Sequence, residues 1–220
     1  MNDIDLSKHY GPLNDTYANR IQQVIDEALI AHPRTMAIRV DLRLPQETEI
    51  SSDSPSIWIR TDHKVITRFM AALTARLKAQ EKRQIKSGRR SYPNTLRYVW
   101  AKEENQQHKV HYHLVLFFNK DAYHTLGNYQ SPSPNLANRI RDSWASALGI
   151  TNFEDMMNYR GLVHFPENPT YYLNRNSPTL REEKNKLRQR ALYLAKRDTK
   201  PYNDRKRWFG TSRVFSQSSL

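Results

Sequence analysis

Apolar residues recur at helical spacing in three long stretches of the chain. They predict helices from about Thr16 to Ala31, from about Asp62 to Lys86 and from Asn135 to Leu148. Pro33 follows the first of these helices and Gly88 the second. Both residue types are typical of helix ends. A short helix is also expected from Asp121 to Leu126.

Strand patterns separate these helices. Met36 to Leu44 alternates apolar residues with mostly charged ones, which predicts a strand with one buried face and one charged outer face. Leu96 to Glu103 and Val110 to Phe118 are rich in β-forming residues, and the polar connection between them predicts a hairpin. Gly161 to Phe165 is a further strand candidate. Helices and strands do not alternate regularly, so we expect an α+β domain with a mainly antiparallel sheet flanked by helices.

Composition narrows the class of protein. The 220 residues include no cysteine, so disulfides and zinc–thiolate sites are excluded. No apolar run approaches the roughly 18 residues of a membrane span. The first residues lack the basic and apolar regions of a signal peptide. These features indicate a soluble intracellular protein with no membrane partner.

The net charge of +13 is concentrated near the C-terminus. Residues 175–220 hold 13 Lys and Arg but only 4 Asp and Glu, which accounts for +9 of the total. Such an excess points to a polyanionic partner. Trp208 and Phe209 lie among these cations and could stack on unpaired bases. The alternative is a solvated helix face followed by a disordered tail.

Two histidines in the predicted hairpin are candidate metal ligands. His111 and His113 are two positions apart on a strand, so their side chains share one face with Cα atoms roughly 6.5 Å apart. The hairpin would bring Glu103 beside them, although Glu104 competes for this place. Two imidazoles and one carboxylate leave coordination positions open, as in catalytic metal sites. His164 is expected to be a core or edge residue without a ligand role.

A tyrosine near the C-terminus is a candidate nucleophile. A helix is expected from Leu180 to Asp198, and Tyr193 lies off its buried stripe. Its neighbours at three and four residues include Arg190, Lys196 and Arg197, so its hydroxyl should project from a basic face. Nearby cations would help the phenol oxygen ionise and would stabilise charge on a phosphodiester.

These residues resemble a known family. Glu103, the strand motif His111-Tyr-His113 and the motif Tyr193-Leu-Ala-Lys196 resemble the HUH endonucleases of the single-tyrosine replication-initiator (Rep) class. More specifically, the chain resembles the YagK/YfjJ-like replication proteins of prophages and inoviruses, from about Thr35 to Arg213. The similar stretches, in family order, are residues 111–123, 143–149, 162–169, 193–196 and 209–213.

The resemblance implies both a fold and an activity. The fold is the HUH-endonuclease (RRM/ferredoxin-like palm) fold, with the metal-binding strand at its centre and the tyrosine helix across the site. The implied domains are an N-terminal helical segment (1–34), an endonuclease domain (35–199) and a basic C-terminal tail (200–220). The activity is nicking and joining of single-stranded DNA at a replication origin. It would start rolling-circle replication of a phage, satellite or plasmid in the bacterial cytoplasm.

The corresponding mechanism assigns each residue a role. His111, His113 and Glu103 would hold Mn²⁺ or Mg²⁺, which acts as a Lewis acid on the scissile phosphate. Tyr193 would attack, giving a 5′-phosphotyrosine and a free 3′-hydroxyl that can prime synthesis. Lys196 would position the phosphate or offset its charge. The residues alone leave the metal open, since imidazole also suits zinc, copper, iron or nickel.

The expected partners are single-stranded DNA or an origin hairpin, together with a host helicase and polymerase. Cationic side chains contact phosphates and so anchor DNA without reading its sequence. The candidates for such contacts are Arg190, Arg197, Lys200, Arg205, Lys206, Arg207 and Arg213.

Two other functions fit some of these features. Two histidines and a carboxylate could form a non-haem iron triad, but this gives the basic C-terminus no purpose. A non-catalytic DNA-binding regulator with an HUH-like fold would use the charge and the aromatic residues without chemistry. Its DNA binding would be salt-sensitive and would survive loss of Tyr193 or of metal.

Overall fold

The computed structural model describes residues 11–45, 59–104, 109–128, 131, 133–197 and 207–213. One sheet has the strand order β4-β1-β3-β2-β6, and β5 pairs with β1 as well. All pairings between these described strands are antiparallel. The strands are β1 (Arg34–Arg43), β2 (Arg97–Glu104), β3 (Val110–Asn119), β4 (Val163–His164), β5 (Thr170–Asn174) and β6 (Phe209–Thr211).

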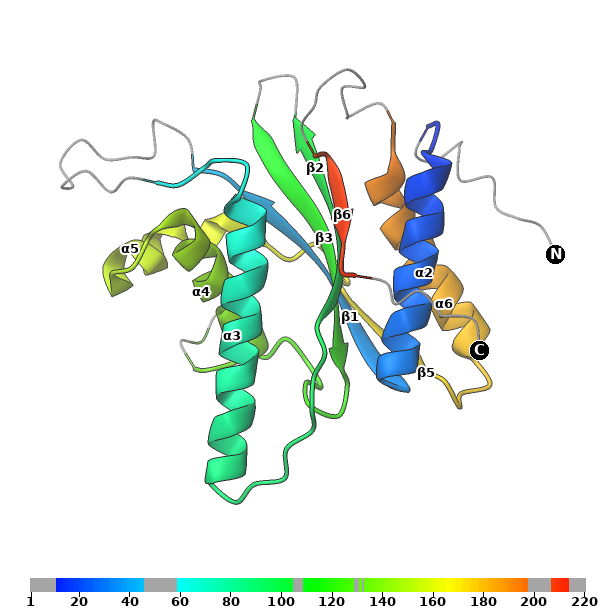
Figure 1. Cartoon of the computed structure of the whole chain (residues 1–220), viewed down its shortest axis with the longest axis horizontal. Coiled ribbons are helices and arrows are strands. Elements are labelled where there is room, and N and C mark those ends of the chain that lie inside the picture. Colours follow the sequence, from blue (N-terminus) through cyan, green and yellow to red (C-terminus); the bar gives the residue numbers. More distant parts are fainter. Residues whose placement is uncertain are drawn as a thin grey trace.

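Helices cover both faces of the sheet (Figure 1). On one side lie α3 (Val65–Lys86), α4 (Leu136–Leu148) and α5 (Phe153–Asn158), and on the other lie α2 (Asp15–Ala31) and α6 (Leu180–Leu192). Two 3₁₀ turns, η2 (Tyr159–Leu162) and η3 (Tyr193–Ala195), follow α5 and α6. The expected α+β architecture is therefore confirmed. None of the described helices combines the length and the apolar character needed to cross a membrane.

The central strand β3 is buried on both faces. Leu114 and Leu116 pack into the core beneath α3 and α4, while Val115 and Phe117 pack into a second core beneath α2 and α6. The predicted hairpin is confirmed, because β2 and β3 pair along their length. Polar side chains near the start of β3 and the end of β2 are consequently enclosed between strands and helices.

The charged face predicted for β1 is not an outer face. Arg39 is only 5% exposed, and the Asp41 side chain is 17% exposed. The reason is tertiary, because the Tyr193 ring of η3 lies close to the Arg39 guanidinium and Asp41 pairs with β3. A polar alternation on a strand shows which residues share a face, but not what covers that face.

The C-terminal helix is shorter than predicted. The α-helix α6 ends at Leu192, and the 3₁₀ turn η3 begins at Tyr193. Backbone groups that would form hydrogen bonds within a longer helix instead bond to the N-terminal segment. Asn14 N donates to Ala195 O at 2.8 Å, and Arg197 N donates to Pro12 O at 3.0 Å. Strand pairing with the segment before α2 therefore ends this helix early.

Two other local predictions also need correction. The helix expected over residues 121–126 is absent: a turn closes after Asn119, because Ala122 N and Tyr123 N both donate to Asn119 O, and residues 123–126 are irregular. The strand expected over residues 161–165 is reduced to the two residues of β4, since η2 occupies its beginning. Strand β5 was not predicted at all. It pairs with the first half of β1.

Strand β6 lies within the range expected to be a tail, and its packing yields a stability prediction. Gly210 pairs with Trp100 of β2, and a Cβ atom there would lie 2.6 Å from the indole ring. We expect Gly210→Ala to lower the free energy of unfolding by about 1–3 kcal/mol through this clash. Urea denaturation followed by circular dichroism measures it. Gly161→Ala is the control, because no atom lies within 4 Å of the position that the new Cβ would take. Equal stability of the two variants would contradict this packing.

Candidate active site

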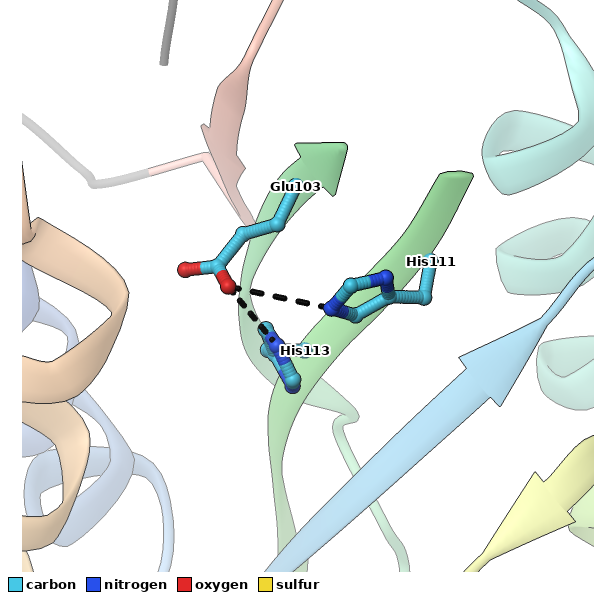
Figure 2. A group of neighbouring side chains, drawn as sticks. All are labelled: Glu103, His111 and His113. Atoms are coloured by element: carbon cyan, nitrogen blue, oxygen red, sulfur yellow. Dashed lines mark hydrogen bonds and ion pairs between the residues drawn. The ribbon is translucent and has the colours of Figure 1, made fainter. Parts of the chain in front are cut away.

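Pairing of β2 with β3 gathers Glu103, His111 and His113 at one end of the sheet. Glu103 lies directly opposite His111 in the register, and His113 is two positions further along the same face. The Glu103 Oε2 atom is 3.0 Å from His113 Nε2 and 3.8 Å from His111 Nε2. One potential ligand atom from each residue lies within 4.8 Å of the other two (Figure 2). This cluster could hold a metal ion.

The donor set fits a divalent ion with open coordination positions. Glu103 is 3% exposed and His113 is 7% exposed, so a carboxylate is held out of water beside imidazole. Glu104 pairs with Val110 instead, and alternation along β2 directs it to the other face of the sheet. Of the two candidates for third ligand, the geometry therefore favours Glu103.

Asp41 of β1 holds the other nitrogen of His113. Its Oδ1 atom is 2.6 Å from His113 Nδ1, so the imidazole bridges two carboxylates. A carboxylate on the far nitrogen is the usual way in which proteins orient a metal-binding histidine. His164 of β4 lies farther out, with its Nδ1 atom 3.8 Å from Asp41 Oδ2 and its side chain half exposed.

The surroundings of the two histidines shift their pKa values in opposite directions. Burial opposes protonation of His113, but hydrogen bonds to Asp41 and Glu103 outweigh it and raise the pKa of this imidazole. Burial, together with the neighbouring His113, lowers the pKa of His111. A divalent ion on His113 Nε2 would displace the proton there, so binding of the ion would release a proton.

Arg39 is a buried cation beside this cluster. Its Nη1 atom forms an ion pair with Asp41 Oδ1, and its Nη2 atom is 2.7 Å from His113 Nδ1. Burial favours the neutral acid of Asp41, yet the His113 hydrogen bond and the Arg39 charge lower the pKa of Asp41 to about 2. His113 and Arg39 together keep Asp41 ionised, in a position from which it can orient His113.

The candidate nucleophile lies against the same cluster. The Tyr193 hydroxyl donates to Glu103 Oε2 at 3.3 Å, and its ring meets the His113 ring edge-on, with centroids 5.0 Å apart. Lys196 Nζ is 4.9 Å from the centre of the Tyr193 ring. The structure thus brings together all five residues that the sequence selected for catalysis and metal binding.

The expected electrostatics of Tyr193 were wrong. Its hydroxyl faces the Glu103 carboxylate rather than projecting from a basic face. Burial and the charge of Glu103 raise the pKa of Tyr193 to about 12, although Arg39 acts in the opposite direction. The phenol is therefore neutral near pH 7, and its proton has an acceptor at Glu103.

The residues expected to bind DNA are only partly described. Arg190 is half-buried, whereas Arg197, Arg207 and Arg213 are exposed. Lys200, Arg205 and Lys206 lie outside the described residues.

The two aromatic residues expected to stack on bases are packed within the protein instead. Trp208 is 5% exposed, with Lys102 Nζ 4.7 Å from its ring centre. Phe209 stacks on Tyr17 with ring centroids 4.2 Å apart. Their place beside β2 and α2 was not visible from the sequence, because β6 pairs with a strand more than a hundred residues away.

The role of Asp41 can be tested by mutation. We expect Asp41→Asn to lower Mn²⁺ affinity by about 10–100-fold, because the amide cannot hold His113 as the carboxylate does. Titration calorimetry at fixed pH measures this affinity. Asp121→Asn is a matched control, since Asp121 pairs with Arg34 at the opposite end of β1. Equal affinities for both variants would show that Asp41 does not orient the ligand.

Comparison with known proteins places the chain in a family. Residues 2–212 match the model of the YagK/YfjJ C-terminal domain. The chain is 39% identical to the uncharacterized protein YfjJ of Escherichia coli K12 over 208 residues, covering 93% of this chain and 97% of YfjJ. It is 35% identical to the uncharacterized protein YagK of the same strain over 198 residues, covering 90% and 92%. No solved structure gives a significant match. The chain therefore belongs to the YagK/YfjJ C-terminal domain family.

Proposed function

We propose that this protein is a metal-dependent HUH-type endonuclease and strand transferase that initiates rolling-circle DNA replication. One observation carries the proposal. A single carboxylate oxygen, Glu103 Oε2, faces both histidines and accepts the Tyr193 hydrogen bond. A metal site and a candidate nucleophile are therefore within reach of one phosphate group. The net charge of +13 suits DNA as the source of that phosphate.

The proposed metal is Mn²⁺ or Mg²⁺, bound by His111, His113 and Glu103. When bound, it would supply Lewis-acid chemistry toward the non-bridging oxygens of the phosphate. The protein itself prepares the ligands, because Asp41 fixes His113 from its other nitrogen. The position of β3 in the middle of the sheet agrees with the palm of an HUH endonuclease, where the metal-binding strand is central.

Tyr193 supplies the attacking oxygen in the proposed reaction. Its Oη forms a bond to phosphorus while the bond from phosphorus to the 3′-oxygen breaks. The phenol proton passes to Glu103, and the departing 3′-oxygen takes a proton from water. The products are a 5′-phosphotyrosine and a free 3′-hydroxyl. Attack by a 3′-hydroxyl reverses the step, so strands can be rejoined without ATP.

Lys196 completes the proposed site. Lys196 lies beside the Tyr193 ring, where its charge can offset the negative charge that develops on the phosphate. The substrate would be single-stranded DNA or an origin hairpin, and a host helicase and polymerase would extend the new 3′-end.

The proposal is tested with single-stranded origin DNA from the same replicon and Mn²⁺, resolved on a denaturing gel. We expect a heat-stable protein–DNA adduct that a chelator prevents. DNA binding without cutting or joining, over several origin fragments and metals, would contradict the proposal. It would favour a non-catalytic DNA-binding regulator instead.

A further inference from the structure

The C-terminal half of α3 projects beyond the rest of the fold. Core contacts of this helix end at Leu77, and Figure 1 shows the helix continuing past the sheet, at the end away from the active site. We name residues 78–90 the α3 arm. It holds one acidic residue, Glu81. Its six basic side chains are all exposed: Lys78, Lys82, Arg83, Lys86, Arg89 and Arg90.

The positive charges of the α3 arm lie close together and have no acidic partner among the residues that the structure describes. Lys78, Lys82 and Lys86 follow one another at four-residue spacing, so like charges are neighbours on one helix face. In the part of the chain that the structure describes, no carboxylate forms an ion pair with any of the six cations. Helix α6 differs, because Lys186 pairs with Glu182 at 2.6 Å. Repulsion of this kind is relieved by a polyanion.

The chemistry of the α3 arm selects duplex over single-stranded DNA. Proteins that hold single strands offer aromatic rings on which unpaired bases stack. Residues 78–90 contain no aromatic residue, and the Arg90 guanidinium lies 4.8 Å from the centre of the neighbouring Tyr92 ring. Cations without stacking platforms suit the phosphate backbone, which a duplex presents at high charge density.

We propose that the α3 arm binds the phosphate backbone of duplex DNA, at a surface separate from the active site. The choice of DNA rests on the proposed function, but the binding does not require any chemistry. The active site lies on the α6 side of the sheet and the arm lies on the α3 side, at the other end. The arm therefore holds double-stranded DNA that flanks an unpaired segment.

Fluorescence anisotropy with a random-sequence duplex of about 25 base pairs tests the proposal, in chelator and at several salt concentrations. We expect Lys82→Gln/Lys86→Gln to weaken duplex binding and to reduce the slope of log K against log salt by about 2, one for each lost phosphate contact. Glutamine preserves helix propensity. The matched control is Arg181→Gln/Lys186→Gln on α6, which should leave the slope unchanged.

Two further measurements separate the α3 arm from the active site. The arm variant should bind oligo(dT), as long as the duplex, with the same affinity as the wild-type protein. It should also form the same amount of adduct with single-stranded origin DNA. An unchanged duplex slope, or an equal loss of oligo(dT) binding, would overturn the proposal. If wild type forms no adduct while the duplex slope still changes, the proposed function fails and the arm stands.

Discussion

Tyr193→Phe should abolish the covalent protein–DNA adduct, with a loss of at least about 10³-fold. The substitution removes only the hydroxyl, which is the attacking atom of the proposed reaction. The ring keeps its edge-on contact with His113 and its place beside Lys196. The lost hydrogen bond to Glu103 should cost only about 0.5–1.5 kcal/mol of stability. Adduct on a denaturing gel and anisotropy with single-stranded DNA measure chemistry and binding separately.

The matched control for this experiment is Tyr172→Phe. Tyr172 is exposed on β5, and its hydroxyl donates to His124 O at 2.9 Å, away from the histidine cluster. This variant should form adduct as wild type does. Adduct formation that persists in Tyr193→Phe would assign the nucleophile to another residue. Loss of DNA binding along with the adduct would instead give Tyr193 a structural role.

The sequence predicted the elements in which local pattern and tertiary environment agree. The hydrophobic stripe of α3, from Val65 to Leu77, is buried as expected. The hairpin of β2 and β3 forms because both strands are rich in β-formers and follow one another closely. The same hairpin fixed the most important part of the candidate site, since its register alone places Glu103 opposite His111.

The remainder of the site depends on pairings between distant segments. Arg39 and Asp41 lie on β1, which pairs with β3 more than seventy residues later. In the sequence they belong to an ordinary alternation of apolar and charged residues. The sequence feature that could have identified Arg39 and Asp41 is that they lie two positions apart on one strand, as His111 and His113 do. This spacing identifies them as neighbours of the histidines only when the antiparallel register is known.

The environment of Tyr193 shows a second limit of local reasoning. Its helical neighbours Arg190 and Lys196 predicted a basic surrounding, and Lys196 does lie beside the ring. Tyr193 keeps helical backbone angles where α6 ends, but its ring packs against Arg39 of β1 and His113 of β3. The hydroxyl donates to Glu103 of β2, across the interface between η3 and the sheet. A helix face read from sequence does not include groups that other elements bring to it.

Removing the charge of Glu103, the proposed carboxylate ligand, should also have a large effect. We expect Glu103→Gln to lower Mn²⁺-dependent adduct formation by at least about a hundredfold, more than the outer carboxylate Asp41 contributes. An amide of the same shape can keep a hydrogen bond to Tyr193 or to His113, but it is neutral and a weaker ligand for a hard cation. Adduct yield over a range of Mn²⁺ concentrations measures the loss.

Glu104→Gln is the matched control, because it makes the same chemical change one residue along β2. Alternation of the strand places residue 104 on the other face, opposite Val110. Its adduct formation and its Mn²⁺ dependence should match wild type. If a high Mn²⁺ concentration restores adduct formation in Glu103→Gln, Glu103 acts mainly by holding the ion. If the adduct yield stays low at saturating Mn²⁺, Glu103 also accepts the proton of Tyr193. An equal loss of adduct in Glu103→Gln and Glu104→Gln would contradict the assignment of Glu103 as the ligand, because the two side chains lie on opposite faces of the sheet.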